Sequence, residues 1–282
     1  MTPLIAAAVL TAAVTHAGWN ALAAGMKDKL VAFTLVGSGG SLCGLAMLPF
    51  VATPAAAAWP YLIASVVVHV VYQALLMRSF TLGDFGQMYP IARGTAPLAV
   101  TVLAAVFAAE LPGAPQLAGV AVASAGLVGL ALWGIRGSGA PPHWAAIVAA
   151  GSTGLAIASY TVIDGLGARA SGTSLGFIAW LMVIEGLPIP LYALATRRGR
   201  LLAEVRPNAV RGLIGGVLSF FAYGLVVWAQ TRAALAPVAA LRESSIIVGA
   251  AIGAVFFKER FGAPRLAAAG LMVVGIGLML LG

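Results

Sequence analysis

Two triplets of ring and amide side chains with the same spacing lie within apolar stretches of the sequence. Each consists of a histidine, a second ring three residues later and an amide four residues later. The triplets are His16, Trp19 and Asn20, and His69, Tyr72 and Gln73. Because residues at i, i+3 and i+4 share one face of a helix, each triplet could stack on a flat apolar solute and hydrogen-bond its polar end. The alternative is a polar clasp between neighbouring helices.

A further polar stretch contains Tyr89, Arg93 and two prolines, Pro90 and Pro97. Proline has no amide hydrogen, so both prolines could kink a helix and act as a hinge, freeing carbonyl groups that only a protein interior or a cavity tolerates. Tyr89 is a candidate cavity residue. Arg93 could bind a substrate carboxylate, but it could equally snorkel to the cytoplasmic interface or be neutralised by a helix C-terminus. The sequence leaves these interpretations of Arg93 open.

The second half of the chain offers a matching set of polar side chains. Ser159 and Tyr160 occupy approximately the place of Gly18 and Trp19 in the first half, and Ser219 and Tyr223 share a helix face at i and i+4. We predict that all four line a substrate cavity.

Charged residues inside apolar stretches are few. Arg242 stands next to Glu243, and this neighbouring pair is interpreted either as a gate near the outer mouth or as a simple ion pair. Glu185 is the acid that lies well inside another stretch, and it could be a proton site or an interhelical hydrogen-bond partner. Asp84 and Asp164 lie at predicted span ends, which disfavours proton-coupled export of cationic drugs.

The composition requires that these residues be positioned within a membrane. Of 282 residues, 61% are hydrophobic and 9% are charged, and the mean hydropathy is +1.02, whereas soluble domains carry about 25% charged residues. The isoelectric point near 10.3 does not indicate nucleic-acid binding, because the basic residues sit in short breaks between apolar runs. The lone Cys43 is interpreted as a small core residue.

Ten apolar runs are long enough to cross a bilayer, which needs about 20 residues per helix. They fall at roughly 3–25, 30–51, 59–79, 84–109, 115–135, 142–164, 173–196, 207–230, 236–257 and 263–281. The first is expected to be a mature helix and not a cleaved signal. The loops on one side hold twelve Lys and Arg and those on the other side two, so the first set is predicted to be cytoplasmic and both termini periplasmic.

An internal repeat divides the chain into two halves. The segment 110–118 (ELPGAPQLA) recurs as 259–267 (ERFGAPRLA) with six of nine positions identical at an offset of 149, and the same offset pairs Arg93 with Arg242. Helices 1–5 (residues 1–139) therefore match helices 6–10 (residues 140–282). Five is odd, so the two copies must have opposite orientations in the membrane. Inverted repeats of this kind are typical of secondary transporters.

With this repeated motif, the whole chain resembles the drug/metabolite transporter superfamily, in particular its ten-helix exporters with two EamA-type repeats, and it is most similar to the bacterial aromatic amino-acid exporters. The resemblance implies an all-α membrane protein of ten transmembrane helices, built as two inverted five-helix repeats around a central cavity. It also implies export by alternating access across a bacterial inner membrane. Small multidrug exporters of this superfamily use a carboxylate in their first helix, and none is present here.

The first functional hypothesis is therefore an exporter of aromatic or large neutral amino acids or related metabolites. The alternative is a multidrug or nucleotide-sugar type transporter of the same fold, and an intramembrane enzyme is a third reading. No HExxH or Walker A motif occurs, and His16 and His69 lie on different helices, so we expect no enzyme, no metal, no cofactor and no direct use of ATP. The expected partners are a small-molecule substrate and the lipid bilayer, without nucleic acid, in a monomer or weak homodimer.

Overall fold

The computed structural model describes residues 1–82, 85–137, 143–248 and 263–281, and all regular structure within these residues is helical. The α-helices are α1 (Pro3–Ala24), α2 (Lys29–Met47), α3 (Trp59–Leu82), α4 (Phe85–Phe107), α5 (Ala114–Gly137), α6 (Trp144–Ala170), α7 (Ser174–Glu185), α8 (Pro188–Arg197), α9 (Leu201–Val205), α10 (Ala209–Gln230), α11 (Leu235–Arg242) and α13 (Ala263–Leu281). Short 3-10 helices occupy Leu48–Phe50, Ala56–Ala58, Arg198–Arg200 and Arg206–Asn208. A helix satisfies its own backbone hydrogen bonds, which is the requirement that lipid imposes on a spanning segment.

Within the described residues, six apolar segments are long enough to cross a membrane. They are Pro3–Ala23, Lys29–Phe50, Ala56–Leu76, Pro90–Phe107, Trp144–Ala170 and Ser174–Gln230, the last of which contains α7 to α10. The prediction of an all-helical, multi-pass membrane protein is confirmed at this level.

Helix ends are set by local side chains. The Thr2 hydroxyl accepts a hydrogen bond from the Ile5 amide at the start of α1, where Pro3 has no amide hydrogen to satisfy. The Asp28 carboxylate accepts from the Leu30 amide (2.9 Å) at the start of α2. These short polar residues therefore begin helices that are otherwise almost entirely apolar.

The sixth predicted span, residues 142–164, ends earlier than the helix in the structure. Helix α6 continues to Ala170, six residues beyond the end expected at residue 164. Gly165 and Gly167 do not end the helix, because side chains of neighbouring helices pack closely against them. Asp164 is therefore not at a span end. It lies inside α6 and is fully buried, so the prediction that places it at a span end is wrong.

The predicted span 173–196 is broken. Helix α7 ends at Glu185 and α8 begins at Pro188, which has no amide hydrogen to donate to the preceding turn. The Ser41 hydroxyl of α2 donates to the carbonyl oxygen of Met182 (3.2 Å) near the break. Glu185 is consequently the last residue of α7.

The predicted span 236–257 is also interrupted within the described residues. Helix α11 ends at Arg242, and Glu243 and Ser244 form a turn before helical structure resumes up to Val248. The remainder of this span, 249–257, lies outside the described residues. Arg242 and Glu243 thus sit at a helix break.

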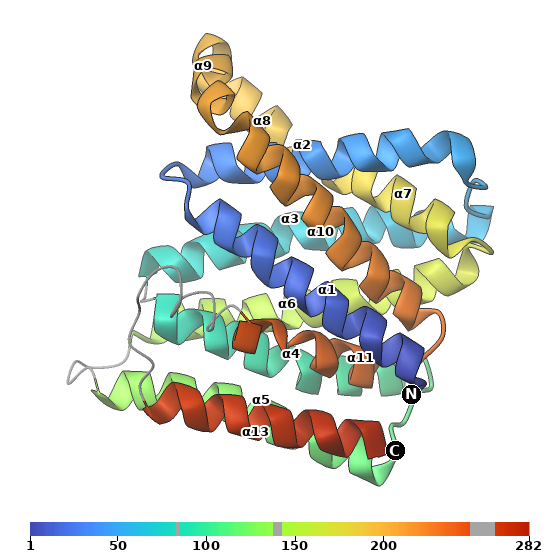
Figure 1. Ribbon diagram of the computed structural model, residues 1–282, viewed down its shortest axis with the longest axis vertical. Coiled ribbons are helices and arrows are strands. Elements are labelled where there is room, and N and C mark those ends of the chain that lie inside the picture. Colours follow the sequence, from blue (N-terminus) through green and yellow to red (C-terminus); the bar gives the residue numbers. More distant parts are fainter. Residues whose placement is uncertain (83–84, 138–142, 249–262, 282) are drawn as a thin grey trace.

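The helices pack in pairs that Figure 1 shows side by side. Helix α1 packs against α10, α3 against α6, α4 against both α5 and α6, and α5 against α13. The start of α1 and the end of α13 lie at the same end of the molecule (Figure 1). The α5 and α13 backbones approach closely at glycines, since a Cβ atom built on Gly275 would lie 2.6 Å from the Gly119 carbonyl oxygen.

Candidate functional site

The first buried polar group, here called the arginine cluster, consists of Arg93 of α4 and Arg242, Glu243 and Ser245 around the break after α11. Arg93 Nε lies 2.6 Å from Glu243 Oε2, and Arg242 Nη2 lies 3.8 Å from Glu243 Oε1. The Arg93 Nη2 group also donates to Ser245 Oγ at 3.2 Å. The side chains of Arg93, Arg242 and Glu243 are 4%, 5% and 1% exposed. Among the described residues, this cluster contains two guanidinium groups and one carboxylate, an excess of one positive charge.

This geometry settles where Arg93 and Glu243 point. Arg93 is buried against Glu243, so its head group does not snorkel to the surface of the protein. Glu243 lies closer to Arg93 than to its sequence neighbour Arg242, whereas the sequence suggested pairing between the neighbours. Adjacent residues project in different directions from a helical backbone, so a partner from another helix reaches Glu243 more directly.

The second buried group, here called the acidic–aromatic cluster, consists of His69 and Tyr72 of α3, Tyr160 and Asp164 of α6, Glu185 of α7 and Tyr223 of α10. His69 Nε2 lies 3.5 Å from Glu185 Oε1. The Tyr223 hydroxyl donates a short hydrogen bond to Asp164 Oδ2. The His69 ring stacks on Tyr160 with 4.0 Å between centroids. Four helices from both halves of the chain therefore meet at this cluster.

The His69 ring is held by its own helix as well. Its Nδ1 atom lies 3.0 Å from the Ser65 carbonyl oxygen and 3.2 Å from the Ser65 hydroxyl. Tyr72 stands edge-on to Tyr160 at 5.6 Å. The rings thereby contact one another, and two of them also contact a carboxyl group: His69 lies next to Glu185, and Tyr223 lies next to Asp164.

Both carboxyl groups of the acidic–aromatic cluster have an oxygen without a hydrogen-bond partner among the described residues. These are Asp164 Oδ1 and Glu185 Oε2. Asp164 is 0% exposed, and a buried acceptor left unpaired costs about 1–3 kcal/mol or more for a charged group. The contacts within the cluster involve neither a lysine nor an arginine.

The α1 triplet is bound mainly to itself. Trp19 Nε1 donates to His16 Nδ1 (3.2 Å), and Asn20 Nδ2 donates to the His16 carbonyl oxygen (2.8 Å). All three side chains are partly buried. The guanidinium groups of Arg93 and Arg242 act electrostatically on His16, so α1 faces the arginine cluster.

The remaining predicted residues are less closely connected to either cluster. Ser159 and Ser219 are partly buried, and the Ser159 hydroxyl donates to the Leu155 carbonyl oxygen of its own helix (2.8 Å). Gln73 is partly buried on α3, and Pro90 and Pro97 are buried within an α4 that continues through both. The side chain of Tyr89 and the whole of Asp84 lie outside the described part of the structure.

Asp164 is the residue of the acidic–aromatic cluster that sequence reasoning missed. It stands four residues after Tyr160, so the two share a helix face, and this spacing was the signal that could have identified it. The cluster otherwise joins five of the predicted residues: His69, Tyr72, Tyr160, Glu185 and Tyr223.

At the end of the molecule near the N-terminus, the repeated motif has a structural contact. Glu110 accepts a hydrogen bond from the Leu235 amide at the start of α11 (2.7 Å) and forms an ion pair with Arg169. Arg169 donates in turn to the carbonyl oxygens of Gln230 (2.8 Å) and Ala233 (2.9 Å). The motif glutamate of the first half thereby fastens the α10–α11 connection of the second half.

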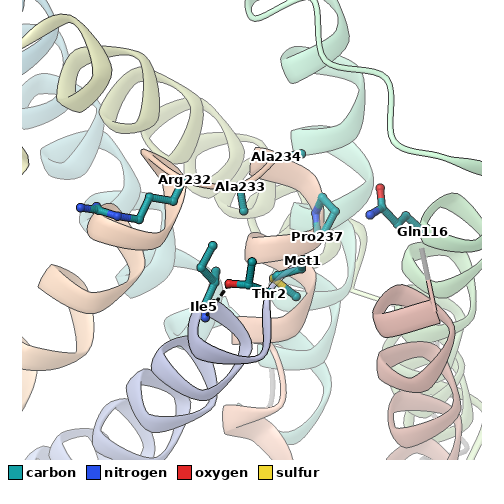
Figure 2. Close-up of a pocket in the computed structure, with 8 residues that line it drawn as sticks. All are labelled: Met1, Thr2, Ile5, Gln116, Arg232, Ala233, Ala234 and Pro237. Carbon is teal, nitrogen blue, oxygen red and sulfur yellow. Dashed lines mark hydrogen bonds between the residues drawn. The ribbon is translucent and has the colours of Figure 1, made fainter.

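Two surface hollows lie away from both clusters. Figure 2 shows one of them, where Met1, Thr2 and Ile5 at the start of α1 lie near Pro237 of α11. Its volume is about 410 Å³. Its Arg232 extends over the Trp228 ring, 4.4 Å from the centroid. The other hollow, of about 370 Å³, is lined by residues 196–200 and Glu204. Neither is lined by a residue of the two clusters.

Comparison with known proteins identifies a domain in the second half. Residues 143–281 match the model of the EamA-like transporter family. Among solved structures, one described only as the crystal structure of a protein aligns over 100% of this chain and 98% of its own, with a TM-score of 0.72 and 17% identity; this likeness concerns the fold alone. The comparison with curated proteins gave no match.

Proposed function

We propose, from the premise that residues 143–281 form an EamA-like transporter domain, that this protein transports small carboxylate-bearing metabolites through the membrane. More specifically, we propose export of aromatic or large neutral amino acids across a bacterial inner membrane by alternating access. The observation that carries the substrate class is the arginine cluster, in which two buried guanidinium groups share one carboxylate.

A substrate carboxylate complements this cluster electrostatically. Burying an excess positive charge in a membrane protein is costly, and such residues mark substrate paths. A second carboxylate would neutralise the excess, and the planar guanidinium of Arg93 or Arg242 can bind it through two parallel hydrogen bonds. The cluster also lies at a broken helix, where transporters commonly place their substrate sites.

Glycine contacts support the proposal of two inverted repeats, 1–139 and 140–282, with ten transmembrane helices. Gly119 of α5 contacts Gly275 of α13. A Cβ atom built on Gly126 of α5 would lie 3.1 Å from the Ala268 carbonyl oxygen of α13. Under the offset of 149, the first contact maps onto the second. The packing of helices agrees: α3 packs against α6, and their counterparts in the other half, α10 and α1, also pack against each other.

Alternating access requires these halves to move relative to each other. Pro90 and Pro97 lie in α4, which packs against both α5 and α6, and we propose them as the hinge. The excess of basic residues in one set of loops supports cytoplasmic placement of that set and periplasmic termini.

The test is uptake into proteoliposomes containing the purified protein, with labelled phenylalanine, tryptophan, methionine, threonine and a quaternary ammonium compound, with and without a pH gradient. We expect saturable flux of phenylalanine and tryptophan. The Arg93→Lys variant keeps the charge but loses the planar fork, so it should transport them more slowly, while Arg232→Lys, altered at an exposed surface arginine, should match the unmodified protein. Flux of the amino acids equal to that of protein-free vesicles would refute the substrate class.

A second candidate, export of organic cations, is favoured by the burial of Asp164 and Glu185. The quaternary ammonium compound in the same panel separates the two. Strong flux of this compound with no effect of phenylalanine as competitor would favour the cation exporter.

A further inference from the structure

We infer that Asp164 and Glu185, enclosed by the rings of His69, Tyr160 and Tyr223, form a binding site for a primary ammonium group. This inference rests on the proposed function and narrows it. The substrate would be a zwitterion with a free amine, and the acidic–aromatic cluster would bind that amine.

The unpaired carboxyl oxygens are the first argument. Asp164 Oδ2 is occupied by the Tyr223 hydroxyl, and the nearby Ser65 hydroxyl also stabilises the Asp164 carboxylate. Glu185 Oε1 faces His69, while Asp164 Oδ1 and Glu185 Oε2 have no partner in good hydrogen-bond geometry among the described residues. Buried acceptors in native structures are nearly always paired. An ammonium group carries three donors and no acceptor, which is the complement of such a site.

The aromatic rings of the cluster are the second argument. The His69 and Tyr160 rings stack at 4.0 Å, and the Tyr223 ring stands edge-on to His69 at 5.8 Å. Aromatic faces attract cations electrostatically, and the same faces accept an aromatic or large apolar side chain. Among the described residues, no three His, Cys, Asp or Glu side chains are arranged to hold a metal ion. An organic cation therefore fits this group of side chains better than a metal does.

The distribution of charge between the clusters is the third argument. The arginine cluster has a positive excess, whereas the acidic–aromatic cluster brings two carboxyl groups to one imidazole. Tyr160 lies within electrostatic range of both, because Arg93, Arg242 and Glu243 of the arginine cluster and Glu185 of the acidic–aromatic cluster all act on it. The two clusters therefore carry opposite excesses of charge near the same tyrosine, as the amine and the carboxylate of a zwitterion do.

The experiment compares ligands that differ only in the amine. Phenylalanine, N-acetylphenylalanine and 3-phenylpropionate share the ring and the carboxylate, and each would compete with labelled phenylalanine for uptake into proteoliposomes. We expect phenylalanine to compete at least about tenfold better than either analogue, the scale of one charge-assisted hydrogen bond. Equal competition by 3-phenylpropionate would overturn the ammonium site and leave a carboxylate transporter standing.

Two variants locate the effect. Asp164→Asn keeps the shape of the side chain and removes its charge, so it should reduce the preference for phenylalanine over 3-phenylpropionate to about threefold or less. Glu204→Gln neutralises a carboxylate at the hollow far from the clusters and should keep the preference intact. An unchanged preference in folded Asp164→Asn overturns the assignment. If that variant does not fold, the three ligands on the unmodified protein decide the question alone.

Absence of flux for every carboxylate in the series overturns the proposed function and, with it, the zwitterion site. This outcome differs from equal competition by the analogues, which removes the ammonium site alone. The two failures are therefore distinguished in a single set of vesicles.

Discussion

Replacing Glu243 by glutamine removes the only carboxylate described in the arginine cluster while keeping the shape of the side chain. In the present structure Glu243 is 1% exposed, and both of its cationic partners are 5% exposed or less. Glu243→Gln would therefore leave two buried guanidinium groups facing a neutral amide. We expect a large loss of stability in the purified protein.

The distances set the order of the effects. At an effective dielectric constant of about 20, charges separated by 2.6 Å and 3.8 Å attract by about 6 and about 4 kcal/mol before desolvation is subtracted. Desolvation offsets much of this attraction. Glu243→Gln leaves two buried positive charges uncompensated, a change that typically costs about 3–5 kcal/mol, whereas loss of one arginine leaves a balanced pair and should cost less. Arg93→Gln should therefore cost more than Arg242→Gln, because Arg93 is the closer partner of Glu243.

The assay is thermal unfolding of the detergent-purified variants, followed by tryptophan fluorescence. Glu243→Gln and Arg93→Gln should each lower the unfolding temperature, and their combination should lower it by less than the sum, because the two residues interact directly. Glu204→Gln, which weakens a half-exposed pair with Arg197, should change the unfolding free energy by about 1 kcal/mol or less. Additive effects of Glu243→Gln and Arg93→Gln, or a Glu243→Gln variant as stable as the unmodified protein, would refute the pairing.

Two further predictions concern packing and helix capping. Gly275→Ala should destabilise the protein by about 1–3 kcal/mol through overpacking against Gly119, whereas Gly277→Ala, with nothing within 4 Å of the new Cβ, should be neutral or slightly stabilising in the same unfolding assay; equal effects would contradict the close approach. Glu110→Ala removes the acceptor of the Leu235 amide and should cost about 1–2 kcal/mol, with faster amide hydrogen exchange at the start of α11. Unchanged exchange there would show that this cap is not needed.

Composition and periodicity predicted the class of the fold because lipid imposes one rule on every spanning segment. Long apolar runs must become helices, so the starts of α1 at Pro3 and α10 at Ala209 fall close to the expected residues. Helix interruptions were not predicted. The break before Pro188 occurs within a continuous apolar run, and it depends on tertiary contacts, such as the Ser41 hydroxyl on α7 carbonyl groups, that a single helix does not display.

The sequence identified most of the residues that meet in the two clusters, and it identified their partners less well. The spacing along single helices predicted His69, Tyr72 and Tyr223, and an approximate correspondence to Trp19 predicted Tyr160. Ring contacts bring these side chains together from α3, α6 and α10. Which carboxylate meets which arginine depends on how helices from different halves face each other. Sequence adjacency suggested Arg242 for Glu243, and the closer partner is Arg93 from 150 positions earlier in the chain.

The two halves cannot carry the same charges at this position, and the packing of α4 explains why. The offset of 149 pairs Arg93 with Arg242 but pairs Glu243 with Gly94. A Cβ atom on Gly94 would lie 2.8 Å from the Leu127 Cβ and 3.2 Å from the Val128 amide nitrogen of α5, so a glutamate does not fit there without separating α4 from α5. The packing of α4 therefore permits a carboxylate beside Arg242 but not at the corresponding position beside Arg93. The excess positive charge that we assign to the substrate carboxylate follows from a steric limit in the first half of the chain.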